Sequence, residues 1–107
     1  MTRLFKPALI LLALCGAPAL ADDAVLTFND GTFSPARLEV AAGDSVKITL
    51  VNAGAEPVEF ESHALRKEKV LGPGVTSFIV LRGVATGEYD FFDDFHPDAA
   101  KGVIVVK

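Results

Sequence analysis

Turn-forming residues recur at short intervals along this sequence, and their spacing limits the chain to short elements. The turn signals are Asn29-Asp30-Gly31, Ala42-Gly43-Asp44, Asn52-Ala53-Gly54, Gly72-Pro73-Gly74, Thr86-Gly87 and His96-Pro97. The runs between them are rich in valine, isoleucine, phenylalanine and threonine, which is typical of β-strands. In one such run, Val46, Ile48 and Leu50 alternate with polar residues, which predicts a half-buried strand. The spacing therefore predicts an all-β fold.

Seven segments after residue 23 have the composition of strands. They are 24–28, 37–40, 45–50, 58–61, 76–80, a next-to-last strand that has Tyr89, Phe91 and Asp93 on one face, and 102–106. About seven short strands in a domain of this length predict a β-sandwich with Greek-key connections. Only 62–69 carries enough helix-compatible residues for a turn of helix, and there the sequence predicts one.

The first 21 residues have the layout of a secretory signal peptide. Arg3 and Lys6 precede an apolar run from Ala8 to Cys15, and Ala19-Leu20-Ala21 supplies small residues for cleavage. The apolar run is too short to span a bilayer, which needs about 20 residues, and no later segment approaches that length. We therefore expect one domain, residues 22–107, exported to the periplasm without a membrane span.

Cysteine content and charge exclude several functions. Cys15 is the only cysteine, so the exported chain has no disulfide, thiolate ligand or cysteine nucleophile. Lipid attachment at Cys15 is the alternative to cleavage, but the bulky Leu14 precedes it where a small residue is expected. The 10 basic and 14 acidic residues give a formal net charge of −4. Nucleic acids and anionic membranes require basic patches, whereas an acidic surface suits a metal ion.

The order of residues across 24–107 resembles the cupredoxins. The first half of that pattern is matched by Phe33, Pro35, Val40, Gly43, Val46 and Asn52. Cupredoxins end with G-x-Y-x-F-x-C-x-x-H and then G-x-I-x-V, and the corresponding residues here are Gly87, Tyr89, Phe91, Asp93, His96, Gly102, Ile104 and Val106. The resemblance implies a cupredoxin-like Greek-key β-sandwich with a metal site at one end.

Three departures remove the ligands of a blue-copper protein. Asp93 stands in place of the cysteine, and Ala100 in place of the axial methionine. The first histidine, expected a few residues after Asn52, is replaced by Val58-Glu59-Phe60-Glu61. Of the set of two histidines, one cysteine and one methionine, only His96 is left. The sequence therefore excludes an ordinary blue-copper electron carrier.

A narrower resemblance comes from the acidic residues and their neighbours. Val58–Ser62, Leu65, Glu68-Lys69 and Phe91–His96 are similar to the EfeO-type cupredoxin-like domains, periplasmic parts of bacterial high-affinity iron-uptake systems. Small free-standing versions of this domain accompany ferrous-iron permeases. The resemblance implies iron or copper handling outside the inner membrane, with a permease as the partner.

Glu61, Asp93 and His96 are the predicted metal ligands. Asp93 shares a strand face with Tyr89 and Phe91, so it points inward, where a carboxylate is usually paired or bound to a metal. The plainer interpretation is an aspartate that accepts backbone N–H bonds from the following loop. His96, three residues later, supplies an imidazole, and its plainer interpretation is an exposed loop histidine. Glu61 approaches the same end if its strand twists or bulges.

Glu59, His63, Glu68 and Asp94 are secondary candidates. Glu59 and Glu61 are two residues apart, so a regular strand projects both outward from one face. Two close carboxylates repel each other unless a cation lies between them, so a vacant site should raise one pKa. The plainer interpretations are a surface histidine for His63, a solvated charge run for Glu68 and an orienting partner for Asp94.

The predicted function is that of a periplasmic accessory of iron uptake, which binds ferrous iron, or copper, for a membrane permease. Oxygen and imidazole ligands suit Fe(II), Fe(III), Cu(II) or Mn(II), whereas Cu(I) prefers thiolates. One mononuclear centre cannot deliver four electrons to oxygen, so a ferroxidase-type role needs a second metal or a partner. The alternatives are a copper-binding electron-transfer partner with a non-blue O/N site, and a metal-free scaffold that docks another protein.

Overall fold

A computed structural model of the chain describes residues 24–107, which contain nine strands and no helix. The strands are β1 (Ala24–Asn29), β2 (Thr32–Ser34), β3 (Arg37–Val40), β4 (Ser45–Asn52), β5 (Val58–Ser62), β6 (Lys67–Leu71), β7 (Thr76–Arg82), β8 (Gly87–Asp93) and β9 (Gly102–Val106). The predicted all-β fold is confirmed, and each of the predicted strands is present. The short β2 and the charged β6 are additional. The predicted signal peptide lies outside the described residues.

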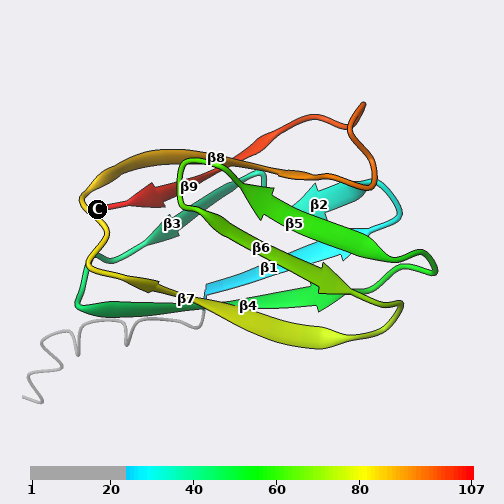
Figure 1. Cartoon of the computed structure of the whole chain (residues 1–107), viewed down its shortest axis with the longest axis horizontal. Coiled ribbons are helices and arrows are strands. Elements are labelled where there is room, and N and C mark those ends of the chain that lie inside the picture. The colour runs from blue at the N-terminus through cyan, green and yellow to red at the C-terminus, as the bar shows by residue number, and fades with distance from the viewer. Residues whose placement is uncertain (1–23) are drawn as a thin grey trace, which may run out of the picture.

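The strands form two sheets that pack face to face (Figure 1). The four-stranded sheet has the order β2-β1-β4-β7, and the five-stranded sheet has the order β3-β9-β8-β5-β6. β1 runs parallel to β4, and β3 runs parallel to β9, while the remaining neighbours are antiparallel. Five of the eight connections between successive strands pass from one sheet to the other, so each sheet contains strands from both halves of the chain. In this described part, no helix is long and apolar enough to cross a membrane.

The core follows from the alternation of side chains along each strand. Its buried residues include Leu26, Phe28, Ile48, Leu50, Val58, Phe60, Phe91 and Ile104. The ring of Phe91 lies at the centre, 4.8 Å from that of Phe33 and 5.5 Å from that of Phe60. Gly102 lies against these rings, where a Cβ atom would collide with Phe91. The core therefore ties β2, β5, β8 and β9 together.

The predicted helical turn at 62–69 is wrong. β5 continues to Ser62, and a tight turn over residues 63–66 returns the chain into β6. The Ser62 hydroxyl donates to the Asp90 carbonyl at 2.7 Å and accepts the Leu65 N–H at 3.2 Å. Pairing with β5 satisfies the backbone of β6, and charged residues are typical of such an edge strand. Tertiary pairing thus overrides the local helical preference.

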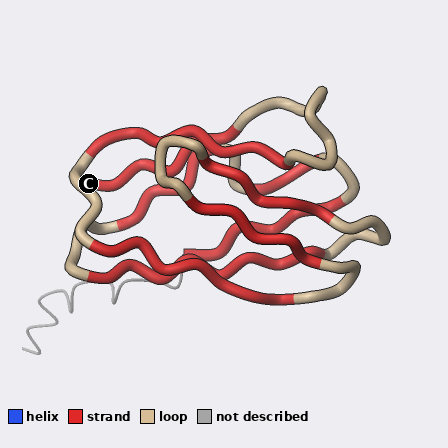
Figure 2. The backbone as a smooth tube through the Cα atoms, in the orientation of Figure 1, coloured by secondary structure: helices blue, strands red, loops and turns tan. Residues whose placement is uncertain are grey.

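Four loops gather at one end of the sandwich, the end at which β1, β4, β6 and β8 finish (Figure 2). The fully buried Asn52 anchors two of them, because its amide nitrogen donates to the carbonyls of Glu56 at 2.8 Å and Gly72 at 3.0 Å. Asp30, in the β1–β2 loop, accepts the N–H of Glu56 at 3.0 Å. The loop before β5 is therefore held from two sides.

Candidate metal centres

The structure divides the predicted metal ligands between two places. β5 buries Val58, Phe60 and Ser62 and turns Glu59 and Glu61 outward, as predicted. Asp93 is paired with Phe60 across the strands, so it points into the sandwich. Glu61 is therefore not brought together with Asp93 and His96, since it lies on the opposite face of the sheet. The strand does not bulge, and a regular strand keeps its alternation.

The outer-face cluster consists of Glu59, Glu61 and Glu68. Each offers a carboxylate oxygen, and these atoms all lie within 4.8 Å of one another. Glu61 is opposite Glu68 in the β5–β6 register, and Glu59 follows on the same face. His63 Nε2 lies 3.2 Å from Glu61 Oε1. The other oxygen, Glu61 Oε2, is buried and has no hydrogen-bond partner among the described residues, so it can accept a cation.

The pKa values of Glu59 and Glu61 are both raised. Desolvation is the main cause at Glu59, followed by the neighbouring carboxyl group of Asp94. Desolvation also raises the pKa of Glu61 most, followed by the neighbouring carboxyl group of Glu68, while His63 lowers it. The close carboxylates thus add to a rise in pKa that desolvation dominates at both residues. A cation bound among them would offset their mutual repulsion.

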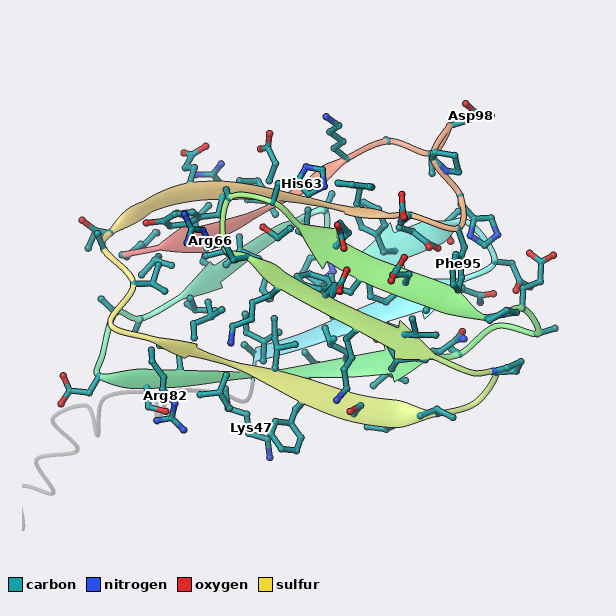
Figure 3. All side chains as sticks on the ribbon, in the orientation of Figure 1. Lys47, His63, Arg66, Arg82, Phe95 and Asp98 are labelled. Carbon is teal, nitrogen blue, oxygen red and sulfur yellow. The ribbon has the colours of Figure 1, made fainter. Side chains whose placement is uncertain are left out.

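A hollow of about 350 Å³ adjoins the outer-face cluster. It is lined by Glu61, Ser62, His63, Arg66, Lys67 and Glu68. Figure 3 labels His63 and Arg66, which lie by the turn between β5 and β6. Solvent and small ions therefore reach the carboxylates of Glu61 and Glu68 from this side.

The loop-end triad consists of Glu56, Asp93 and His96. His96 Nδ1 lies 2.7 Å from Asp93 Oδ2, and His96 Nε2 lies 3.0 Å from Glu56 Oε1. The Asp93 side chain is only 1% exposed, and its Oδ1 accepts the N–H groups of Glu59 and Phe95, both at 3.0 Å. The predicted inward direction of Asp93 is confirmed. Its plainer interpretation, an acceptor for backbone groups of the following loop, also describes what the structure shows.

The two neighbouring acids raise the pKa of His96. Hydrogen bonding to Glu56 is the main cause and hydrogen bonding to Asp93 the second, while desolvation acts in the opposite direction. A protonated imidazole donates from both of its nitrogens, which matches an acceptor on each side. The raised pKa and the acceptor at each ring nitrogen both favour the protonated form of His96.

Sequence reasoning missed Glu56. The sequence pattern indicates 58–61 as the replacement for the first cupredoxin histidine, but Glu56, before β5, is the residue that reaches His96. A signal was present, because Glu56 follows Asn52 by four positions and precedes Pro57. Its direction depends on the contacts of the loop with Asn52 and Asp30, which the sequence does not display.

The strand order defines a two-sheet Greek-key sandwich, the class of fold to which the cupredoxins belong. The chain is a member of the cupredoxin-like domain family, whose model matches residues 4–106. A curated relative, an uncharacterized protein of Rickettsia prowazekii (strain Madrid E), is 37% identical over 81 residues. That alignment covers 76% of this chain and 65% of the relative, so the chain spans less than two thirds of the relative's length.

Solved structures share the fold. A purple cupredoxin from Nitrosopumilus maritimus is 23% identical with a TM-score of 0.64, covering 79% of this chain and 100% of that one. Reduced auracyanin from Roseiflexus castenholzii is 16% identical with a TM-score of 0.64, covering 79% and 96%. The Cu(I) form of an amicyanin variant is 27% identical with a TM-score of 0.56, covering 79% and 82%. The predicted cupredoxin-like β-sandwich is therefore confirmed.

The family raises the question of whether copper fits this chain. Residues 24–107 contain neither cysteine nor methionine, so both sulfur ligands of a blue-copper site are missing there. At the loop end, one imidazole is present, and both oxygens of Asp93 already accept hydrogen bonds. The loop-end triad therefore does not fit blue copper. The carboxylates of the outer-face cluster, with the imidazole of His63, fit Cu(II) or iron.

Proposed function

We propose that this protein is a periplasmic metal-binding accessory of ferrous-iron uptake, related in role to the EfeO-type domains that its sequence resembles. In this proposal the outer-face cluster binds the metal through Glu59, Glu61 and Glu68, with His63 as the imidazole donor. One observation carries the proposal: three carboxylates converge within 4.8 Å, and one of them, Glu61, has a buried oxygen without a hydrogen-bond partner in the described chain. Carboxylates and imidazole are common ligands for iron and for Cu(II).

The donor set also bears on redox chemistry. Three anionic oxygens stabilise Fe(III) more than Fe(II), because the higher charge gains more from each carboxylate. Ferrous iron held by these residues is therefore easier to oxidise than iron in water. Because one centre cannot supply four electrons to oxygen, a ferroxidase-type role would require a second metal or the partner permease. The protein on its own is proposed to bind iron and to deliver it.

Export to the periplasm is part of the same proposal. The basic start, short apolar run and Ala19-Leu20-Ala21 support a cleavable signal peptide over residues 1–21. The domain that acts is then 22–107. Delivery to a permease in the inner membrane requires the iron-binding domain on that side of the membrane.

Copper is the second candidate metal, because the solved relatives include a Cu(I)-bound amicyanin variant. The protein would then be an electron-transfer partner with a non-blue O/N site. A metal-free docking scaffold is less well supported, because a docking role does not explain why three carboxylates lie so close together.

Calorimetry under anaerobic conditions tests the proposal. The mature chain is titrated with Fe(II), Cu(II), Mn(II) and Zn(II), followed by Glu61→Gln, Glu68→Gln and the control Glu88→Gln. Glu88 is exposed and pairs with Arg37 at 3.3 Å, away from the cluster. We expect one metal ion per chain and a loss of affinity of about tenfold or more for the two cluster variants, at least the effect known for residues around metal ligands. Wild-type affinity in Glu61→Gln would exclude the outer-face cluster.

A further inference from the structure

The loop-end triad is connected to the outer-face cluster through the main chain of Glu59. Asp93 Oδ1 accepts the Glu59 N–H at 3.0 Å, and the Asp94 N–H donates to the Glu59 carbonyl at 2.9 Å. Both backbone polar groups of Glu59 are therefore held by the end of β8. β5 and β8 share a short ladder of two residue pairs, so these bonds extend the pairing at the point where Glu59 leaves the loop.

Each polar atom of the Asp93 and His96 side chains already has a partner. Asp93 Oδ1 accepts two N–H groups, and Oδ2 is bonded to His96 Nδ1 at 2.7 Å. His96 Nε2 is bonded to Glu56 at 3.0 Å. A metal bound through either ring nitrogen of His96 would have to break one of these bonds. In contrast to Glu61, Asp93 has no buried oxygen that lacks a partner in the described chain.

Three loops hold the triad in place. Asn52 and Asp30 fix the loop that carries Glu56. The His96 ring packs on Gly31, where an added Cβ atom would lie 3.3 Å from ring Cδ2. The His96 N–H donates to the Asp93 carbonyl at 3.0 Å, which closes the turn that follows β8. The histidine is thus held by its main chain, by both ring nitrogens and by packing.

We infer that Glu56, Asp93 and His96 form a metal-free latch, which stands where cupredoxins hold copper and positions Glu59 in the outer-face cluster. Asp93 and His96 are then positioning residues, and they do not ligate the metal. The positioning of Glu59 for metal rests on the proposed function. The latch itself is a property of the metal-free protein. It links the closed end of the sandwich to the face on which the proposed metal site lies.

Amide hydrogen exchange of the metal-free mature protein tests the latch. The variant is His96→Ala, the control is the exposed Glu88→Gln, and core amides of Ile48 and Ile79 report global opening. We expect the Glu59 and Phe95 amides to exchange about tenfold faster or more in His96→Ala, relative to the core amides. Glu88→Gln should exchange like wild type. Unchanged protection of the Glu59 amide in His96→Ala would overturn the latch.

Pulsed electron paramagnetic resonance of the Cu(II)-loaded mature protein tests the ligand assignment. Imidazole nitrogen coupling should be lost in His63→Ala and retained in His96→Ala, with one copper per chain in both wild type and His96→Ala. Loss of coupling in His96→Ala, with retention in His63→Ala, would overturn the inference by making His96 a ligand. If the wild-type protein binds no metal, the proposed function is wrong. The amide-exchange experiment then still shows whether the latch exists, because it uses metal-free protein.

Discussion

Asn52 illustrates how one buried side chain can determine the shape of a loop. Its carboxamide lies at the end of β4, is fully buried, and bonds to backbone groups in the β4–β5 loop and around the end of β6. The nitrogen donates to the carbonyls of Glu56, Leu71 and Gly72, and the oxygen accepts the Gly54 N–H at 3.0 Å. Buried backbone groups without partners are costly. The single carboxamide of Asn52 thus provides hydrogen-bond partners for several backbone groups in two loops.

Replacement of Asn52 by alanine is expected to destabilise the protein by about 3 kcal/mol, because it leaves buried carbonyls without donors. Urea unfolding of the metal-free protein measures the change, with the exposed Asn29→Ala as the matched control. A loss similar to that of Asn29→Ala would show that water replaces the amide. The loop bearing Glu56 would then depend on other contacts.

His96 predicts a dependence of stability on pH. Bonding to Glu56 and Asp93 raises the pKa of His96 above its ordinary value of 6.5. A group with a higher pKa in the folded state stabilises the fold fully below its unfolded-state pKa, and this effect disappears as the pH rises through the folded-state pKa. The free-energy difference between wild type and His96→Asn should therefore be largest below about pH 6 and shrink at alkaline pH. Urea unfolding across this range measures it, and a difference that grows with pH would contradict the ion-paired triad.

At the scale of elements, the β5–β6 hairpin places charge at the edge of a sheet. β6 is the edge strand of the five-stranded sheet, and its residues Lys67, Glu68 and Lys69 are charged. Such charges discourage pairing with other chains. Glu68 also faces Glu61 across the hairpin, so the same register that protects the edge brings two acids together. The hairpin therefore combines edge protection with the candidate metal site.

Glu61→Gln is expected to have opposite effects on the metal-free and metal-loaded protein. Desolvation and Glu68 raise the pKa of Glu61, so its ionised form opposes folding above its ordinary value of 4.5. Glutamine removes this charge, and the melting temperature of the metal-free protein should rise at neutral pH. The further rise in melting temperature on adding Fe(II) or Cu(II) should be smaller in Glu61→Gln than in wild type, because a ligand that binds more weakly stabilises the fold less. Calorimetric melting with and without metal measures both, and a lower melting temperature in the metal-free variant would contradict this account.

At the scale of the whole molecule, the cupredoxin-like sandwich separates two kinds of site. The loop end, where Phe95 and Asp98 lie in Figure 3, carries a triad with its hydrogen bonds satisfied. The outer face carries crowded carboxylates with one orphaned oxygen. A shared fold therefore does not place the candidate site of this chain where the blue-copper ligands would be.

Copper-loaded mature protein should lack the intense thiolate-to-copper absorption of blue-copper proteins. No cysteine occurs in residues 24–107, and oxygen and imidazole ligands give weak d–d bands instead. Visible spectroscopy of the Cu(II)-titrated protein checks this expectation, with Zn(II)-titrated protein as the blank. An intense charge-transfer band would require a sulfur ligand, which residues 24–107 do not supply.

Exported protein is expected to begin at Asp22 and to carry no lipid. The small residues before Asp22 favour signal cleavage there, whereas Leu14 disfavours lipid attachment at Cys15. Intact-mass measurement of the protein from a periplasmic fraction decides between the two. A diacylated chain starting at Cys15 would overturn both the cleavage site and the free periplasmic domain.

The sequence by itself determined the features that depend on near neighbours along the chain. Alternation with a period of two predicted most of the strands, the inward direction of Asp93 and the outward pair Glu59 and Glu61. Turn residues predicted where the strands end. The spacing of glycine, aromatic and aliphatic residues in the last two strands indicated the cupredoxin-like fold. The strand β6 escaped this reasoning because its charged residues lack alternation, and pairing with β5 is what orders them.

Only the tertiary structure decided which candidate ligands meet. Whether Glu61 joins Asp93 or Glu68 depends on the register between β5, β6 and β8, which is set by packing across the core. Whether Glu56 reaches His96 depends on a loop held by groups distant in sequence. These are contacts between segments that only the folded chain brings together, and a local pattern carries no information about them.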